Sequence, residues 1–267
     1  LEAPEAFMRF DPETLKVRPN FGDKEGLRER LATYYAMIEN LDWNIGRLLD
    51  SIENQADFKD KTMTVYFSDH GDFMGSHNQI EDKGHPHEES TRIPAVFHCP
   101  GRIPAQGNRR ELFSLLDMVP TTLGFADIDL PGYLQGVDFS PALRREPFKG
   151  PEHILLEMVG NPHVHFDYVD WRGLVSDRWK YAFYETGHEV LFNLQEDPFE
   201  QYNLAKNNLE ACEKMRQLLL GMLSEAREPY FDILIKHGAK PDGPALNSST
   251  RRRDGIAPHW DDLIENV

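Results

Sequence analysis

The stretch Val65-Tyr66-Phe67-Ser68-Asp69-His70-Gly71-Asp72 says most about the fold of this chain. A run of strand-forming apolar residues ends abruptly at a carboxylate and an imidazole, and a glycine follows at once. This pattern predicts a short buried strand over residues 61–68 whose C-terminal end presents Asp69 and His70. In open α/β sheets, ligands bind at that end of the strands. We therefore expect the chemistry of the chain there.

Asp69 and His70 are neighbouring side chains that can both bind a divalent cation. Within a strand they would point to opposite sides, but at a strand-to-loop bend both can turn toward one ion. Further oxygen ligands would favour calcium or magnesium over zinc. In the alternative interpretation, Asp69 hydrogen-bonds the backbone of a turn and His70 lies at the surface.

The loop of residues 71–90 contains a single lysine, Lys83. A lysine that a glycine-containing loop holds near a metal can neutralise an oxyanion as a compact charge. Alternatively, it is solvated and paired with Glu81 or Asp82. His77 lies earlier in the same loop, whereas His85 and His87 flank Pro86 and are expected to pack or to line a rim. A second apolar run, over residues 93–97, follows the loop.

The overall composition narrows the possible partners. A formal net charge of −16 over 267 residues argues against a nucleic-acid partner, and the dense basic run Arg251–Arg253 is explained by a solvated tail. The chain has no run of about 18 apolar residues, so no membrane span is expected. Two cysteines, Cys99 and Cys212, are too few for a disulfide scaffold.

Periodicity predicts the remaining elements and three regions. A long amphipathic helix is expected over residues 24–54, a strand over 95–98, and a helix over 118–125 with Asp117 as its N-cap. Four short strands near residues 154–157, 171–175, 179–184 and 190–192, and a covering helix over 209–227, indicate an antiparallel subdomain. We predict an α/β domain in residues 1–150, the antiparallel subdomain in 151–235 and an extended tail in 236–267.

Several motifs together resemble the type I sulfatases of the alkaline-phosphatase superfamily. They are Ser68-Asp69-His70-Gly71-Asp72, Met74-Gly75-Ser76-His77, Lys83, and Glu88-Glu89-Ser90-Thr91-Arg92-Ile93-Pro94 followed by Pro100-Gly101. Trp171-Arg172-Gly173 and Asp177-Arg178-Trp179-Lys180-Tyr181 are similar to the C-terminal subdomain of that family. The resemblance covers the chain up to about Phe231 and implies an alkaline-phosphatase-like sheet flanked by helices, with a small C-terminal antiparallel sheet plus helix.

The resemblance also implies roles for individual residues. Asp69 and His70 would be metal ligands of a Ca²⁺ ion, with Mg²⁺ as an alternative. Lys83 would bind the sulfate oxygens and stabilise charge on the bridging oxygen as the ester breaks, and His77 falls near the substrate in some relatives. The implied reaction is hydrolysis of a sulfate ester on a small molecule or glycan, and the implied location is periplasmic or extracellular.

The chain departs from the family pattern in one important respect. The family makes its nucleophile, formylglycine, from a Cys/Ser-x-Pro-x-Arg motif that is absent here, because Cys99-Pro100-Gly101-Arg102 has the wrong spacing. The early aspartate ligands are absent too. We therefore expect this chain to be the C-terminal portion of such an enzyme, inactive without an N-terminal half that carries the formylglycine.

Two rival functions stay open at this point. One is a phosphonate or phosphate ester hydrolase of the same superfamily, and the other is a non-catalytic carbohydrate-binding relative. The aromatic residues Tyr168 and Trp171, like His163 and His165, could line a substrate cleft, although a packed subdomain core also explains the aromatic ones.

Overall fold

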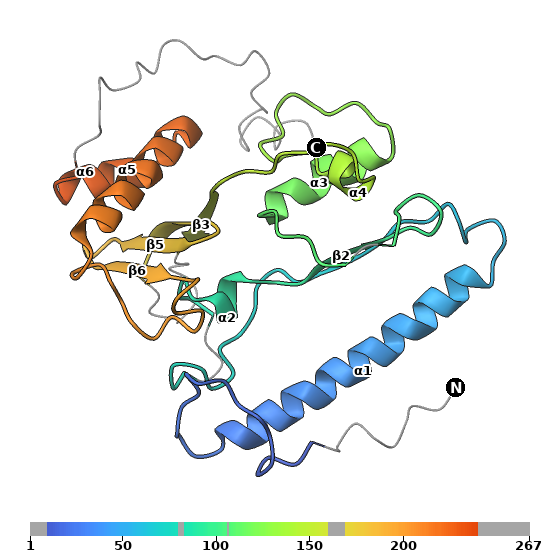
Figure 1. The fold of residues 1–267 in the computed structure, drawn as a ribbon, viewed down its shortest axis with the longest axis horizontal. Helices are drawn as coiled ribbons and strands as arrows, with labels where there is room; N and C mark the ends of the chain where they lie inside the picture. The colour runs from blue at the N-terminus through green and yellow to red at the C-terminus, as the bar shows by residue number, and fades with distance from the viewer. Residues whose placement is uncertain (1–9, 80–82, 106, 160–168, 240–267) are drawn as a thin grey trace, which may run out of the picture.

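The computed structural model describes residues 10–79, 83–105, 107–159 and 169–239. The described chain forms two parts that lie side by side in Figure 1: an extended part built around a long helix and a two-stranded sheet, and a four-stranded sheet with two helices against it. The tripeptide Arg251–Arg253 and residues Tyr168, His163 and His165 lie outside the described residues.

Helix α1 spans Leu27–Glu53, as its apolar periodicity predicts. It begins after Gly26, which has a φ of 78° that favours glycine. Only its first turns are well buried, through Leu27, Leu31, Ala32 and Ala36. Farther along, Met37 is 63% exposed and Leu48 is 58% exposed. Most of the predicted apolar face is therefore uncovered within the described part of the chain.

Strands β1 (Thr64–Phe67) and β2 (Ala95–His98) pair antiparallel, with Thr64 opposite His98. The predicted positions of both strands are confirmed, but the expectation that the first one is buried is wrong. Its residues are half-buried and Phe67 is 48% exposed. The reason is that the described residues supply only these two strands of the expected larger sheet, so no neighbouring strand shields them.

Short helices complete the first part: α2 (Glu88–Thr91), the 3₁₀ turn Leu115–Asp117, α3 (Met118–Phe125) and α4 (Ser140–Leu143). Helix α3 was predicted correctly and Asp117 is its N-cap residue as predicted, but the Asp117 side chain makes no capping hydrogen bond to α3. The Asp117 carboxylate instead accepts hydrogen bonds from the backbone N–H groups of Ser114 and Val137, at 2.7 Å each. It thereby closes a capping box with Ser114 around the 3₁₀ turn.

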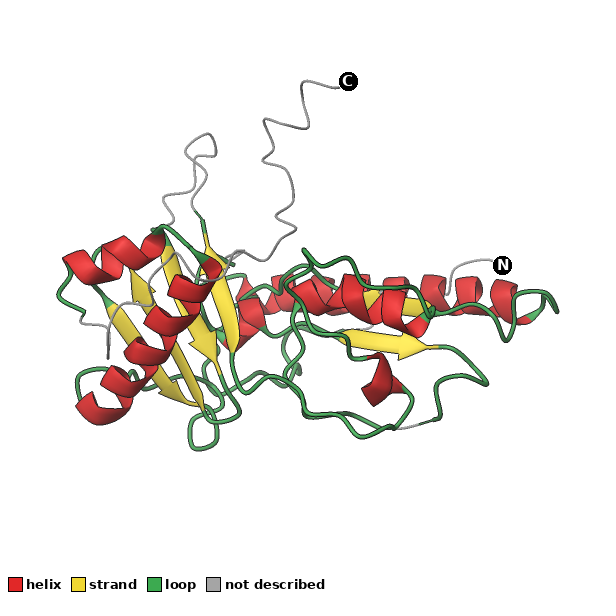
Figure 2. Cartoon of the chain, turned by 90° about the horizontal axis from the view of Figure 1, so that it is seen from above, coloured by secondary structure: helices red, strands yellow, loops and turns green. Residues whose placement is uncertain are grey.

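The second part is an antiparallel sheet with the strand order β3-β4-β5-β6. Its strands are Ile154–Met158, Trp171–Val175, Trp179–Tyr184 and Glu189–Asn193. Helix α5 (Leu209–Ala226) crosses one face of the sheet, as Figure 2 shows, and α6 (Tyr230–Lys236) follows it. The strands and α5 were predicted, whereas α6 was not.

The core of this part lies between the sheet and the two helices. Buried side chains from the strands meet buried side chains from α5 and α6, namely Leu174, Tyr181, Leu191, Leu219, Leu223 and Leu234. Each fully buried leucine of this kind contributes about 1.5–3 kcal/mol of transfer free energy. The core thus fixes the sheet as a rigid platform.

Three further features bear on the predictions. Cys99 and Cys212 are both buried free thiols, so they form no disulfide with each other. In the described part of the chain, no helix combines the length and apolar character needed to cross a bilayer. The predicted boundaries at residues 150 and 235 stay predictions.

Candidate functional site

The site begins at the bend that follows β1. The Asp69 carboxylate accepts a hydrogen bond of 2.9 Å from the His70 backbone N–H through Oδ1, while Oδ2 lies 3.5 Å from His70 Nε2. The backbone hydrogen bond, followed by the His70 ring, lowers the pKa of Asp69 below its usual value. Two potential metal ligands therefore lie together at the strand end, and the carboxylate is ionised.

A hydrogen bond of the other His70 nitrogen, Nδ1, fixes the tautomer of the ring. His70 Nδ1 lies 2.8 Å from the Gly71 carbonyl oxygen. Because a carbonyl oxygen can only accept, Nδ1 carries the proton in this contact, and in the neutral ring Nε2 then keeps its lone pair free. Histidine metal ligands are usually oriented by such a hydrogen bond from their second nitrogen.

The bend packs directly against the start of α2. The Gly71 N–H donates a 2.8 Å hydrogen bond to the Ser90 carbonyl oxygen. A Cβ atom on residue 71 would lie 2.0 Å from the Glu89 carbonyl oxygen, so only glycine fits at this close approach.

Ser90 also holds the backbone of Lys83. Its hydroxyl donates to the Lys83 carbonyl oxygen at 2.5 Å, and the Ser90 residue is buried. One residue of α2 is thus bonded both to the bend of Asp69 and His70 and to the loop of Lys83. The structure brings these three predicted site residues to the same small region, although 12 residues lie between His70 and Lys83 in the sequence.

The Lys83 side chain is exposed. Its ammonium makes no hydrogen bond or ion pair with any residue that the structure describes; Glu81 and Asp82, its alternative partners, lie outside those residues. The Asp69 side chain is also 80% exposed. The described chain therefore leaves both the Asp69 carboxylate and the Lys83 ammonium accessible.

His77 belongs to an interior cluster. Its Nε2 lies 3.0 Å from Asn20 Nδ2 and 3.8 Å from Glu89 Oε2. Because the Asn20 amide can only donate through Nδ2, His77 Nε2 is the acceptor. Burial lowers the pKa of His77, and the Glu89 carboxylate partly opposes the shift. Its predicted role near the substrate stays a prediction.

His85 and His87 pack inside the loop, as expected. Both rings contact Phe73, with centroid distances of 6.1 and 5.4 Å. Burial lowers the pKa of His87 to about 3, and the neighbouring His77 ring and Lys180 ammonium add to the shift. His87 is therefore neutral at physiological pH.

Residues of the four-stranded sheet also reach this loop, and the sequence alone did not assign them to the site. Trp171 is buried, and its indole Nε1–H donates to the Gly84 carbonyl oxygen at 2.7 Å. Lys180, fully buried, contacts Glu88 and Glu200. The packing interpretation of Trp171 is thereby confirmed. The sequence signal that could have pointed to Lys180 is its position among the apolar residues of a strand.

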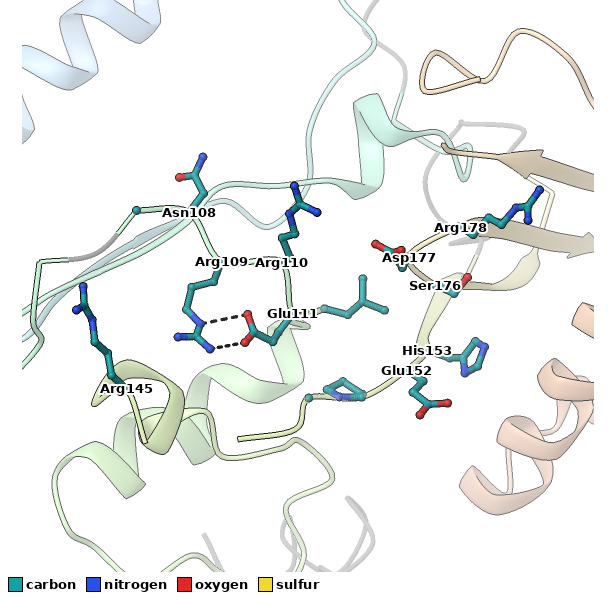
Figure 3. Close-up of a pocket in the computed structure, with 14 residues that line it drawn as sticks. Asn108, Arg109, Arg110, Glu111, Arg145, Glu152, His153, Ser176, Asp177 and Arg178 are labelled. Carbon is teal, nitrogen blue, oxygen red and sulfur yellow. Dashed lines mark hydrogen bonds and ion pairs between the residues drawn. The ribbon is translucent and has the colours of Figure 1, made fainter. Parts of the chain in front are cut away.

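A cavity of about 860 Å³ lies elsewhere, between the loop before α3 and the turn that joins β4 to β5. Its lining includes Arg109, Arg145 and Arg178 but also Glu111, Glu152 and Asp177. Figure 3 shows Arg109 and Glu111 facing each other, with Nε 3.1 Å from Oε2. Arg110 also lines the cavity, so four arginines face three carboxylates there, and none of the predicted site residues lines it.

A metal site cannot be completed from the described residues alone. Among them, no group of three or more histidine, cysteine, aspartate or glutamate side chains could hold an ion. The donors that are present, one ionised carboxylate and one imidazole with a free Nε2, fit part of a site for a divalent cation, which would need further ligands.

Comparisons with known proteins identify families and relatives that the chain resembles. The family model described as Sulfatase matches residues 2–128, and the model described as N-sulphoglucosamine sulphohydrolase, C-terminal, matches residues 75–228. An arylsulfatase of Clostridium perfringens is 29% identical over 79% of this chain and 43% of its own length. An N-acetylglucosamine-6-O-sulfatase of Bacteroides thetaiotaomicron is 28% identical over 77% of this chain and 37% of its own length.

Solved structures extend the comparison to the fold. A crystal structure assigned as the sulfatase yidJ of Bacteroides fragilis superposes with a TM-score of 0.75 at 27% identity, over 86% of this chain and 52% of that one. A phosphonate monoester hydrolase of Agrobacterium radiobacter shares the fold, with a TM-score of 0.62 at 22% identity over 79% of this chain and 42% of that one. The chain thus spans about 40% of the length of the two curated relatives above.

Proposed function

The chain belongs to the sulfatase family, and from this we propose that it supplies part of the metal and sulfate site of an enzyme that hydrolyses a sulfate ester. The observation that carries the proposal is the pair of hydrogen bonds made by Ser90. One joins α2 to the bend of Asp69 and His70, and the other joins it to the backbone of Lys83.

Asp69 and His70 are proposed as two ligands of a Ca²⁺ ion, with Mg²⁺ as the alternative. The ionised carboxylate and the free Nε2 of His70 support this assignment. When bound, the cation would neutralise negative charge that develops on the sulfate group. The chain's own contribution is to hold the two ligands at one strand end.

Lys83 is proposed to bind the sulfate oxygens and to stabilise charge on the bridging oxygen as the ester bond breaks. Its exposed ammonium, held by a backbone that Ser90 anchors, supports this role. His77 is proposed to lie near the substrate, with its ring held by Asn20 and Glu89.

The substrate class is proposed to be a sulfated small molecule or glycan. One relative is named as an N-acetylglucosamine-6-O-sulfatase, which favours a glycan. Because the chain carries a net charge of −16, local cations such as Lys83 and the metal are needed to attract an anionic substrate. A periplasmic or extracellular location is proposed from the habit of the family.

Catalysis is proposed to require a partner segment, the N-terminal half of the same enzyme, which would carry the formylglycine nucleophile and the remaining metal ligands. Exposed apolar side chains support the existence of a covering segment. They lie on α1, on the two-stranded sheet and at the start of α3, namely Met37, Leu48, Phe67, Val96 and Val119. By itself this chain would then turn over no substrate.

The experiment uses the complete enzyme with an aryl sulfate and an aryl phosphonate offered side by side. Asp69→Ala and Lys83→Ala are compared with the exposed control variants Asp57→Ala and Lys59→Ala, which lie in the turns after α1. We expect Asp69→Ala to lose bound calcium and both site variants to lower kcat/KM by on the order of 10² or more. The control variants should match the wild type.

Each outcome has a definite meaning. Faster turnover of the aryl phosphonate than of the aryl sulfate would favour the phosphonate hydrolase, whose fold this chain shares. Normal calcium content and turnover in Asp69→Ala would overturn the metal assignment, and normal turnover in Lys83→Ala would overturn the role of the lysine.

A further inference from the structure

The four-stranded sheet has two faces with different partners, and the strand register assigns each residue to one of them. Leu174, Tyr181 and Leu191 are directly opposite one another and pack against α5 and α6. The other face carries the cross-strand pairs Trp171–Tyr184 and Lys180–Phe192. We call these four residues the loop-facing side of the sheet.

The loop-facing side first meets the loop beside Lys83. The Trp171 indole donates to the carbonyl oxygen of Gly84, the residue that directly follows Lys83. The next contact is between His85 Nδ1 and the Tyr184 hydroxyl, at 3.3 Å. The His87 ring then packs against Phe192, with a centroid distance of 5.3 Å. Three successive points of the loop thus contact three strands.

Lys180 provides the second and stronger attachment, at α2. Its Nζ lies 2.6 Å from Glu88 Oε1, 2.9 Å from Glu200 Oε1 and 3.2 Å from Thr91 Oγ1. Glu200 in turn accepts a 2.6 Å hydrogen bond from the Glu88 backbone N–H. A single buried ammonium therefore joins β5 to both ends of α2.

A buried ion cluster of this kind is poor evidence for stability, because apolar residues of the same volume often stabilise a fold as well or better. What the cluster provides is a defined position, since two carboxylates and a hydroxyl must all meet one ammonium. Loss of the ammonium would leave both carboxylates without their cation. Lys180 is 0% exposed, so in the folded chain its ammonium depends on these protein partners.

We propose that the loop-facing side of the sheet positions Lys83 for the sulfate group, with Trp171 and Lys180 as positioning residues. The proposal rests on the role of Lys83 stated above. Trp171 fixes the backbone next to Lys83, and Lys180 fixes α2, whose Ser90 bonds both Lys83 and the metal-binding bend. The C-terminal subdomain thereby sets the distance between the lysine and the metal ligands.

The first test compares Trp171→Phe with Trp179→Phe in the complete enzyme. Both remove an indole from the same sheet, but only Trp171 donates its indole N–H to the loop. We expect Trp171→Phe to speed amide hydrogen exchange in residues 84–91 about tenfold and to lower kcat/KM about tenfold. Trp179→Phe should change neither quantity. Unchanged exchange in Trp171→Phe would overturn the proposal.

The second test is a double-mutant cycle with Lys83→Ala, because a positioning residue must act through the residue that it positions. If Trp171 acts through Lys83, the tenfold loss from Trp171→Phe shrinks to less than about twofold in the Lys83→Ala background. An equal loss in both backgrounds means that Trp171 has only a general structural role, and the proposal is then wrong.

Lys180→Met extends the cycle to α2, with Lys149→Met as control because Lys149 forms an exposed ion pair with Glu152. The same shrinkage in the Lys83→Ala background is expected for Lys180→Met. If that variant does not fold, Trp171→Phe still decides. Normal activity of Lys83→Ala would refute the proposed role of Lys83, whereas the exchange measurement tests the attachment of the loop independently of Lys83.

Discussion

Replacing Gly71 with alanine tests the contact on which the site geometry depends. The new Cβ would lie 2.0 Å from the Glu89 carbonyl oxygen, and real Cβ atoms essentially never approach another heavy atom within 3.0 Å. The bend and α2 must therefore separate by about 1 Å. The backbone fixes the position of the Cβ and the Glu89 oxygen is itself a backbone atom, so no flexible side chain can relieve the clash.

The expected effect on stability follows from the contacts that are lost. The Gly71 N–H would lose its 2.8 Å bond to the Ser90 carbonyl oxygen, which costs about 1–3 kcal/mol for a poorly solvated group. Overpacking adds about 1–3 kcal/mol. We therefore expect Gly71→Ala to lower the free energy of unfolding by roughly 2–6 kcal/mol, measured by urea denaturation.

The effect on activity is a separate measurement. A displacement of about 1 Å between the metal ligands and Lys83 should lower kcat/KM of the complete enzyme by on the order of 10². Gly132→Ala is the control, because its Cβ would meet nothing within 4 Å. If the free energy of unfolding of Gly71→Ala lies within about 0.5 kcal/mol of the wild-type value, the close packing of the bend against α2 is refuted.

Two further predictions concern α2 and the histidine cluster beside it. Ser90→Ala removes the hydroxyl bond to the Lys83 carbonyl oxygen but keeps the bond from Gly71. We therefore expect the free energy of unfolding, measured by urea denaturation, to fall by about 1–2 kcal/mol and kcat/KM to fall severalfold. The exposed Ser51→Ala is the control. In His87→Phe, the pH dependence of the free energy of unfolding should change. Folded His87 has a pKa of about 3 against 6.5 unfolded, so wild-type stability falls as pH drops from 6.5 toward 3, by up to about 1.4 kcal/mol per unit. The variant should lose that part of the dependence below pH 6.5 and show no difference in slope above it, and identical slopes below pH 6.5 would contradict the burial of a neutral ring.

The elements with strong local patterns were predictable from the sequence. Helix α5 keeps Met215, Leu219 and Leu223 on one face, and the strands of the second part are short apolar runs separated by turn residues. Helix α6 was missed because its seven residues, Tyr230–Lys236, are too few to establish a helical period. Its position depends on packing with α5, which no local pattern reveals.

Burial was less predictable than secondary structure. The pattern of α1 predicts an apolar face over its whole length, but Met37 and Leu48 are exposed because the described residues offer no partner there. The same reason explains the exposed Phe67 in β1. A periodic pattern states which face needs a partner, and it does not state whether that partner lies in the same stretch of chain.

The candidate site also has one part that the sequence predicts and one part that only the structure reveals. Asp69 and His70 are adjacent at a strand end, so their proximity follows from the sequence alone. The connection of Lys83 to them depends on two hydrogen bonds, one from the Ser90 hydroxyl to Lys83 and one from the Gly71 N–H to Ser90. Both form only when the loop folds back onto the bend. Hydrogen bonds of this kind have no periodic signature, so only the structure reveals that α2 is the common anchor.

Lys180 shows where a sequence pattern can still point to function. In the strand Trp179–Tyr184 its neighbours on the same face, Ala182 and Tyr184, are apolar or aromatic, so a solvated lysine would be inconsistent with that face. A lysine in such a position requires buried acceptors, and the glutamates that supply them lie far away in the sequence, at positions 88 and 200. Burial raises the pKa of Glu200 to about 7, although Lys180 lowers it in part. Burying three ionisable groups is weak evidence for stability, whereas its geometric consequence is direct: the ammonium joins β5 to α2, and Ser90 of α2 bonds the backbone of Lys83.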